Sequence, residues 1–211
     1  MENARSEPST CGRKVPTLVD MAIANPGGLK NLRDRLLPYA PDPEGLINAV
    51  LEQSTNSSSP LHGEEHWRAV AAAGISIGSV TAGVDVPVVF LFALFHDALR
   101  WNEHHDPDHG DRGTKLTQEL LDEGLISLPE EPKRLLKNAC RLHSDGFTTH
   151  DPTVGTCWDA DRVNLWRVCM TPDSALMSTT EGRSEERIEW ARAALRDVPT
   201  WDRLLQLPIA I

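Results

Sequence analysis

Residues of the types that bind transition metals are concentrated in the middle of this 211-residue chain, where all eight histidines lie between His62 and His150. Within this range His96 and Asp97 are adjacent, near the end of the apolar segment FLFALFHDALR. Burying a carboxylate beside an imidazole costs free energy, and a divalent metal compensates because it keeps the imidazole neutral and the carboxylate ionised. The pair therefore indicates a metal site at the end of a buried helix. The alternative is a helix end with a capped histidine and an exposed aspartate.

Further candidate ligands lie on both sides of this pair. Upstream, LHGEEHWRAV places His62 and His66 four residues apart. They share one face if the helix that carries Trp67 extends back to His62. Downstream, CWDADRVNLWRV supplies Asp159 and Asp161. Helical periodicity does not choose between these aspartates, because residues two apart face nearly opposite ways and both have apolar partners.

With these motifs the chain resembles the HD-domain superfamily of metal-dependent phosphohydrolases. The resemblance covers roughly residues 59–170 and rests on the ordered segments HGEEHWRAV, ALFHDALR, DPDHGDRGTKL, ACRLHSDG and DADRVN. It implies an all-α fold of the HD-domain type. It also implies a metal held by His66, His96, Asp97 and Asp161. Asp159 is then expected to hydrogen-bond to a metal-binding residue without binding the metal itself, or to stabilise the fold.

The resemblance to binuclear members of the superfamily implies a second ion. His109, in HGDRG, and His143, in RLHSDG, stand where those members have additional histidines, and Asp97 would bridge the ions. Two ions about 3.5 to 4 Å apart can activate a hydroxide and hold both oxygens of a phosphoryl transfer. We expect one or two ions, preferably two, of Mn, Fe, Co, Ni or Zn. Alternatively, His109 only begins a helix and His143 only complements a helix dipole.

Three residues are predicted to act in catalysis, namely His62, Asp97 and Arg100. His62 would contact the substrate, protonate a leaving group or hydrogen-bond to His66. The alternative is that His62, in a loop after Pro60, has none of these roles. Arginine pairs with two phosphate oxygens at once. Candidates for binding a phosphate in this way are Arg100, Arg112 and Arg162. The alternative for each is a surface ion pair.

Three other histidines are weaker candidates. His104 and His105 lie in a loop rich in Pro and Asp, where they would reach a phosphate at the pocket mouth or simply be solvated. His150 belongs to no motif and is expected to be structural.

The predicted activity is hydrolysis of a phosphomonoester or phosphodiester of a small molecule, preferably a nucleotide, by a metal-activated water. One alternative is a mixed-valent di-iron oxygenase of the same superfamily, and another is a nucleotide-binding regulatory module. The His-Asp pair is not followed by Gly-Lys, and HSDG is not followed by GYP. Cyclic dinucleotides are therefore not the expected substrate.

Helical periodicity predicts the elements that must position these residues. The expected helices span residues 64–80, 86–99, 108–123, 131–143, 156–170 and 184–197, and no strand pattern competes with them. Ser184 is the expected N-cap of the last. The predicted organisation is a flexible leader (1–15), a helical N-terminal extension (16–58), the metal-binding core (59–180) and C-terminal helices that pack on the core (181–211).

Composition limits the possible partners. A formal net charge of −10 argues against broad nucleic-acid binding or adsorption to anionic lipid. The chain begins with no apolar signal segment, and its longest apolar run is about half a membrane span, so we expect a cytoplasmic protein with no membrane partner. The four cysteines show no CxxC spacing, which predicts reduced core thiols and no disulfide.

Overall fold

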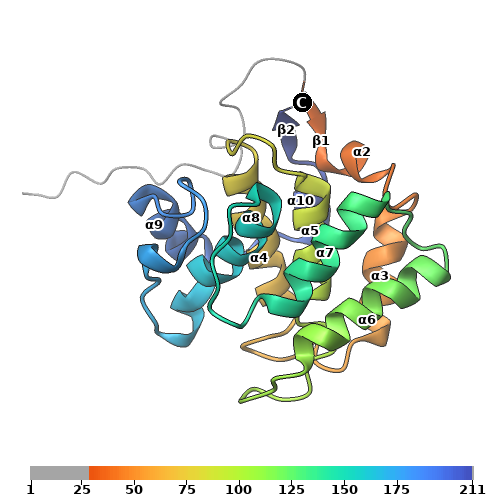
Figure 1. The fold of residues 1–211 in the computed structure, drawn as a ribbon, viewed down its shortest axis with the longest axis horizontal. Coiled ribbons are helices and arrows are strands. Elements are labelled where there is room, and N and C mark those ends of the chain that lie inside the picture. Colours follow the sequence, from red (N-terminus) through yellow and green to blue (C-terminus); the bar gives the residue numbers. More distant parts are fainter. Residues whose placement is uncertain (1–28, 211) are drawn as a thin grey trace, which may run out of the picture.

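The computed structural model describes residues 29–210, and almost all of their regular structure is helical (Figure 1). The elements are β1 (Leu29–Asn31), α2 (Leu32–Leu36), α3 (Pro43–Gln53), α4 (Glu64–Gly78), α5 (Val86–Phe95), α6 (His109–Asp122), α7 (Glu130–Leu142), α8 (Pro152–Arg162), η1 (Val163–Val168), η2 (Ser174–Leu176), α9 (Glu185–Ala194), α10 (Trp201–Leu205) and β2 (Pro208–Ala210). The predicted all-α class is confirmed. The expected leader and residues 16–28 of the expected extension lie outside the described residues.

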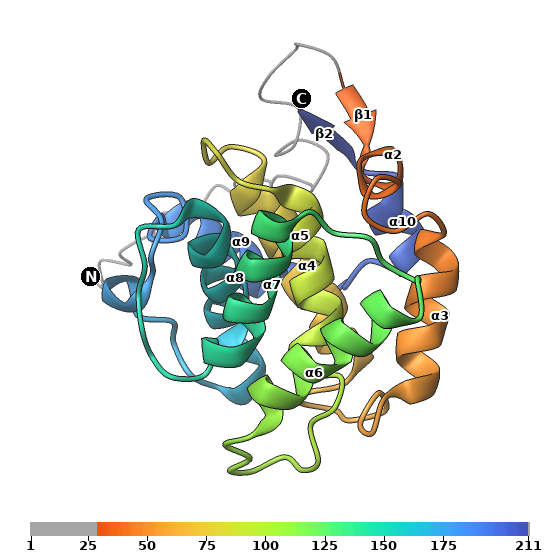
Figure 2. The same cartoon turned by 45° about the vertical axis from the view of Figure 1, so that its right-hand side comes forward.

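Helix α5 forms the centre of the core. Every one of its residues is buried, and α4, α7 and α8 pack against it, as two views show (Figures 1 and 2). The carboxylate of Asp85 caps its start by accepting a hydrogen bond from the Val88 N–H at 3.2 Å, and Pro87 occupies the first turn. A helix that is apolar all round is stable only when it is enclosed. The apolar run therefore fixes where its C-terminal end, with His96, must lie.

The predicted helix 86–99 is too long, because α5 ends at Phe95 and His96 is its C-cap. The backbone N–H of Ala98 bonds the Phe95 carbonyl at 3.3 Å, and that of Arg100 bonds the Asp97 carbonyl at 3.1 Å. Such short-range bonds tighten the end of a helix into a turn. Asp97 therefore projects from a turn and not from a helix face.

The predicted helix 156–170 is wrong at both ends. Helix α8 begins at Pro152, where the carboxylate of Asp151 accepts hydrogen bonds from the N–H groups of Thr153 at 3.0 Å and Val154 at 2.9 Å. This cap makes a proline favourable in the first turn. At Arg162 the α-helix gives way to the 3-10 helix η1, which ends before Cys169 with a left-handed φ of 59°.

A short antiparallel pair, β1 with β2, joins the two ends of the described chain and was not predicted. Strands of three residues carry too little alternation to detect. Nearby, the ring of Trp201 in α10 meets the ring of Phe90 edge to face, with centroids 5.6 Å apart, so the C-terminal segment contacts the core. Ser184 precedes α9 as predicted, but its side chain makes no capping hydrogen bond.

Two other predictions concern the cysteines and membrane spans. Cys140 and Cys157 are buried free thiols, but Cys169 is exposed, so the prediction of a core thiol is wrong there because η1 ends at the surface. Cys11 lies outside the described residues. None of the helices between residues 29 and 210 combines the length and apolarity that a membrane span requires.

Candidate metal centre

One group of candidate ligands combines the start of α4, the end of α5 and the last turn of α8. The Nε2 atoms of His66 and His96 are 3.3 Å apart, and the Nε2 atom of His66 is 3.2 Å from Oδ1 of Asp161. Ligand atoms of these three residues all lie within 4.8 Å of one another. This spacing is that of a site that can hold one metal ion.

A second group combines α6 and α7 with the turn after α5. His109 is the first residue of α6, His143 is the C-cap of α7, and their Nε2 atoms are 2.8 Å apart. Oδ1 of Asp97 lies 3.5 Å from Nε2 of His109 and 3.7 Å from Nε2 of His143. These three residues also keep their ligand atoms within 4.8 Å of one another.

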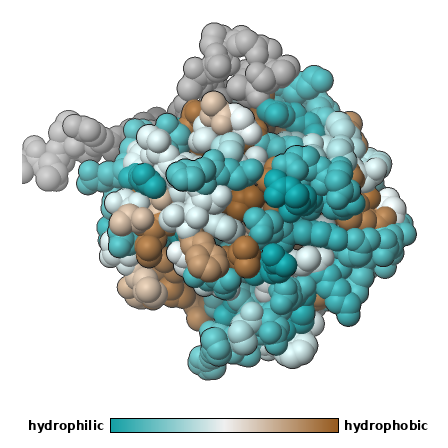
Figure 3. All heavy atoms as spheres, in the orientation of Figure 1, coloured by the Kyte–Doolittle hydropathy of each residue, from teal (hydrophilic) through white to brown (hydrophobic). Residues whose placement is uncertain are grey.

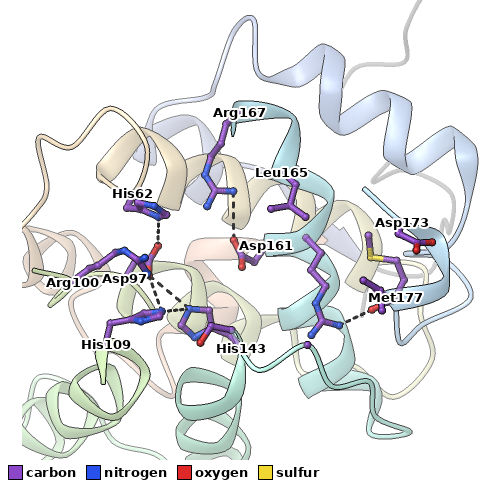
Figure 4. A pocket seen from close by; sticks show the side chains of 14 residues that line it. His62, Asp97, Arg100, His109, His143, Asp161, Leu165, Arg167, Asp173 and Met177 are labelled. Atoms are coloured by element: carbon purple, nitrogen blue, oxygen red, sulfur yellow. Dashed lines mark hydrogen bonds and ion pairs between the residues drawn. The ribbon is translucent and has the colours of Figure 1, made fainter. Parts of the chain in front are cut away.

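The carboxylate of Asp97 lies between the two groups. Figure 4 shows it beside His62, His109 and His143. While Oδ1 faces His109 and His143, Oδ2 is 3.7 Å from Nε2 of His66 and 3.6 Å from Nε2 of His96. Asp97 is only 2% exposed, so solvent does not satisfy these oxygens. A carboxylate placed in this way can bridge two cations.

Backbone carbonyls fix the tautomers of three of the histidines. Nδ1 of His96 faces the carbonyl oxygens of Phe92 at 3.2 Å and Ala93 at 3.1 Å, and Nδ1 of His143 faces that of Cys140 at 2.7 Å. Because a carbonyl only accepts, each Nδ1 must donate, which leaves the Nε2 lone pair in the neutral ring directed at the site.

His109 follows the same pattern, since its Nδ1 donates to the carbonyl oxygen of Asp106. The lone pairs of His109 and His143 then face each other across 2.8 Å, which is unfavourable unless a cation or proton lies between them. Oδ1 of Asp97 and Oδ1 of Asp161 are buried atoms without a hydrogen-bond partner among the described residues. The residues therefore fit one or two divalent metal ions.

Burial and charge set the protonation of the ligands. Burial lowers the pKa of His66 and His109, and it lowers the pKa of His96 to about 3. Burial alone would also lower the pKa of His143, but the carboxylate of Asp97 outweighs it and raises that pKa. Three of the four imidazoles are therefore held in the neutral form that binds metal.

The two carboxyl groups are held ionised. Burial would raise the pKa of Asp97, but neighbouring His96, His143 and His62 hold it well below its ordinary value. Burial would likewise raise the pKa of Asp161, but His66 and Arg167 lower it far below that value. Ionised carboxylates among neutral imidazoles form a donor set suited to a divalent transition metal.

Glycines in the HGDRG segment bring α6 close enough to complete the second group. A Cβ atom at Gly110 would lie 2.6 Å from the carbonyl oxygen of Arg141 and 2.7 Å from that of Cys140, both at the end of α7. At Gly113 it would lie 3.0 Å from the carbonyl oxygen of Phe95, at the end of α5. Only glycine allows this backbone approach. The segment thus positions His109 against the ends of both helices.

A cavity of about 310 Å³ opens beside the two groups. Besides the candidate ligands Asp97, His109, His143 and Asp161, its lining includes His62, Arg100, Arg162 and Arg167, and its apolar part includes Leu165, Leu176 and Met177. Cavities of this size suit small molecules. The expected catalytic residues His62, Asp97 and Arg100 are thus brought together.

His62 reaches the site from the loop before α4. Helix α4 begins at Glu64, where the predicted helix 64–80 begins, so the condition for His62 and His66 to share one helix face is not met. The loop nevertheless fixes the residue, since the Ser59 hydroxyl accepts from the His62 N–H at 2.8 Å and the indole N–H of Trp67 donates to the His62 carbonyl at 2.7 Å. Nδ1 of His62 lies 3.1 Å from Oδ2 of Asp97.

Arg100 borders the metal groups at the start of the following loop. Its Nη1 lies 3.6 Å from Oδ1 of Asp97, and its other nitrogens donate to the carbonyls of Asn102 at 3.0 Å and His104 at 2.7 Å. These bonds fix the guanidinium at the edge of the cavity.

The structure leaves several candidates outside the site. Arg112 pairs with Asp106 and stacks on the ring of Trp101 at 3.9 Å, so it does not line the cavity. The side chains of His104, His105 and His150 are exposed and also lie outside the cavity lining. An exposed position gives no support to the expected structural role of His150.

Asp159 is completely buried but faces away from the metal groups. Its carboxylate accepts hydrogen bonds from the backbone of Ser178 at 2.6 Å and of Thr179 at 2.8 Å, and from the Thr179 hydroxyl at 2.8 Å. It therefore ties the segment after η2 to α8, in agreement with the expected structural role.

Sequence reasoning missed Arg167. Its Nε donates to the carbonyl of Leu61 at 2.8 Å, and its Nη1 lies 3.8 Å from Oδ1 of Asp161. Helical periodicity gave no signal, because the chain changes from α to 3-10 geometry between Asp161 and Arg167.

Comparisons with protein-family models, curated proteins and solved structures found no match to this chain.

Proposed function

We propose that this protein is a metal-dependent phosphohydrolase of the HD-domain type, with two ions bridged by Asp97. One ion would be held by His66, His96 and Asp161, and the other by His109 and His143. The observation that carries the proposal is the Asp97 carboxylate, whose two oxygens face two separate sets of histidines at 3.5 to 3.7 Å. The substrate is a phosphomonoester or phosphodiester of a small molecule, with a nucleotide preferred.

The chemistry needs a nucleophile, charge neutralisation and a proton for the leaving group. Bound divalent ions would supply an activated water and neutralise charge on the phosphoryl oxygens. His62 lies at the edge of the cavity, where its Nδ1 donates to Oδ2 of Asp97 and its Nε2 is 3.9 Å from Oε2 of Glu103. It would protonate the leaving oxygen in this proposal.

Three arginines support an anionic substrate such as a phosphoester. Arg100, Arg162 and Arg167 line one cavity, and guanidinium groups pair with phosphate oxygens in a bidentate manner. In a protein of net charge −10, this local positive lining supports selection of an anionic ligand.

The test is hydrolysis of a phosphoester panel after chelation and reloading with Mn, Fe, Co, Ni or Zn. We expect wild-type protein to hydrolyse at least one ester class with one of these metals, and Asp97→Asn to lose about a thousandfold or more in kcat/KM. Asp111→Asn, which changes an exposed carboxylate in the first turn of α6, is the matched control and should retain activity.

Three results would contradict the proposal in different ways. Oxygen consumption by an iron-loaded protein that hydrolyses no ester would favour the oxygenase. A nucleotide that binds tightly and survives unchanged would favour the regulatory module. Equal inactivity of wild type and Asp97→Asn throughout the panel would remove the support for hydrolysis.

A further inference from the structure

Arg162, the last residue of α8, carries a buried nitrogen that nothing in the fold satisfies. The residue is 8% exposed, and its Nη1 donates to the carbonyl of Leu176 at 2.6 Å. Its Nη2 is buried and has no hydrogen-bond partner among residues 29–210, and no carboxylate of that range forms an ion pair with the guanidinium. A buried charged donor left unpaired costs more free energy than a neutral one. Asp159 and Asp161 act on this guanidinium electrostatically, but neither accepts a hydrogen bond from it. Nη2 therefore remains able to donate to an anionic group of a ligand.

The guanidinium lines the same cavity as the metal groups but at its other end. Arg162 is bonded to the carbonyl of Leu176, beside Met177. In Figure 4, Met177 and Asp173 lie on the side of the cavity away from Asp97. Asp161 lies between Asp97 and these two residues. The cavity thus has metal ligands at one end and a buried guanidinium towards the other.

Apolar side chains line the cavity beside Arg162. Leu165, Leu176 and Met177 contribute to the lining, and hydrophobic residues gather on the surface over the segment between α8 and α9 (Figure 3). Met170 and Leu176 are the large exposed hydrophobic residues of this segment. A ligand that spans the cavity would pack an apolar part against Leu165, Leu176 and Met177.

The nearby carboxylate of Asp173 does not replace the missing anion. Its Oδ1 accepts the backbone N–H of Ala175 at 2.9 Å, at the start of η2, and it forms no ion pair with Arg162. Nη2 of Arg162 therefore remains available to a ligand.

We propose that Arg162 binds a second anionic group of the substrate, a carboxylate or a phosphate, which an apolar linker separates from the phosphoryl group at the metal end. The proposal deepens the proposed function, because it takes the metal end as the place of the phosphoryl group. The oxyanion accepts from Nη2 of Arg162, and the linker packs on Leu165, Leu176 and Met177.

The experiment measures binding without turnover. Calorimetric titration of manganese-loaded protein would compare three non-hydrolysable series of increasing chain length, namely alkylphosphonates, ω-carboxyalkylphosphonates and α,ω-bisphosphonates. At a matching chain length we expect a second anionic group to tighten binding by about tenfold or more. The carboxylate and bisphosphonate arms identify which oxyanion is preferred.

Variants assign this gain to Arg162. In Arg162→Met the advantage of the second anionic group should disappear, while Arg162→Lys should recover part of it because the charge remains. Arg183→Met is the matched control, since Arg183 donates to the neighbouring carbonyl of Met177 at 3.0 Å but does not line the cavity. It should keep the full advantage, and metal content should be equal in all variants.

Two results would overturn the inference. One is a wild-type protein in which no chain length of either doubly anionic series binds more tightly than the plain alkylphosphonate. This comparison needs no variant and stands even if Arg162→Met does not fold. The other is an advantage that persists in Arg162→Met. Because the probes are not hydrolysed, failure of the proposed activity on the ester panel leaves both readouts intact.

Discussion

At the scale of single residues, the centre is organised by Asp97 and by carbonyl groups behind the histidines. The carbonyls of Phe92, Asp106 and Cys140 hold the Nδ1 atoms of three imidazoles, so the Nε2 lone pairs converge. Asp97 faces all of these lone pairs while it is only 2% exposed. Such convergence of acceptors stores unfavourable electrostatic energy, which a bound cation would relieve.

This electrostatic arrangement predicts how stability depends on pH. In chelated protein we expect the free energy of unfolding to fall as pH drops below about 6.5, the value at which an unfolded histidine takes up its proton. Burial lowers the pKa of folded His96 to about 3. Below about pH 6.5, His96 therefore binds a proton in the unfolded state but stays neutral in the folded state. His66 and His109 act in the same direction, and His143, with its raised pKa, acts in the opposite direction.

Urea unfolding near neutral pH and at about pH 5 would measure this dependence. His150→Gln, which changes an exposed histidine, should leave the slope unchanged. An unfolding free energy that stays constant or increases towards pH 5 would show that the histidines are not held neutral.

Sequence reasoning could identify some of these residues and not others, for physical reasons. His96 and Asp97 were detectable because a charged pair at the end of an apolar run needs compensation. The choice of Asp161 over Asp159 required the family resemblance, since both positions suit a helix. Arg167 was undetectable, because its position depends on a change of helix type that apolar spacing does not encode.

At the scale of elements, caps and glycines determine where the ligands point. The turn after α5 directs Asp97 between the two groups, and the close approach at Gly110 brings His109 to His143. Most helix positions were predictable from apolar periodicity. Helix ends were not, because the cap at Asp151 and the turn at Asp97 are local hydrogen-bond features and not features of the apolar pattern.

The close approach at Gly110 gives a prediction for this scale. Gly110→Ala should push α6 away from the carbonyls at the end of α7, destabilise the protein by about 1 to 3 kcal/mol and weaken binding of one ion. Lys115→Ala, at an exposed position of the same helix, is the control. Chemical denaturation and metal titration would measure both effects. Wild-type stability and metal affinity in Gly110→Ala would exclude a positioning role for this contact.

At the scale of the whole molecule, the candidate ligands come from five helices or their ends. The groups join the start of α4, the end of α5, the start of α6, the end of α7 and the end of α8. These elements surround the buried α5 and are far apart in sequence (Figure 2). A cation at this junction would link most of the core, so its binding energy would add to the stability of the fold.

Metal removal should therefore lower the thermal unfolding midpoint. A metal at about a hundred times its Kd contributes about 2.7 kcal/mol, which for a protein of this size corresponds to roughly 5 to 10 °C. Differential scanning fluorimetry with and without chelator would measure the shift. Asp97→Asn should abolish it, whereas Asp111→Asn should retain it. An equal shift in wild type and Asp97→Asn would indicate metal binding elsewhere on the protein.

The most direct test of the central claim is the number of metal ions bound per chain. Elemental analysis of wild-type protein equilibrated with excess Mn, Fe, Co, Ni or Zn should give two ions for at least one metal. The double variant His109→Ala with His143→Ala should give one ion, because it removes both imidazoles of one group and leaves His66, His96 and Asp161. One ion or none in wild type with every metal, or an equal number in the double variant, would contradict a two-metal centre bridged by Asp97.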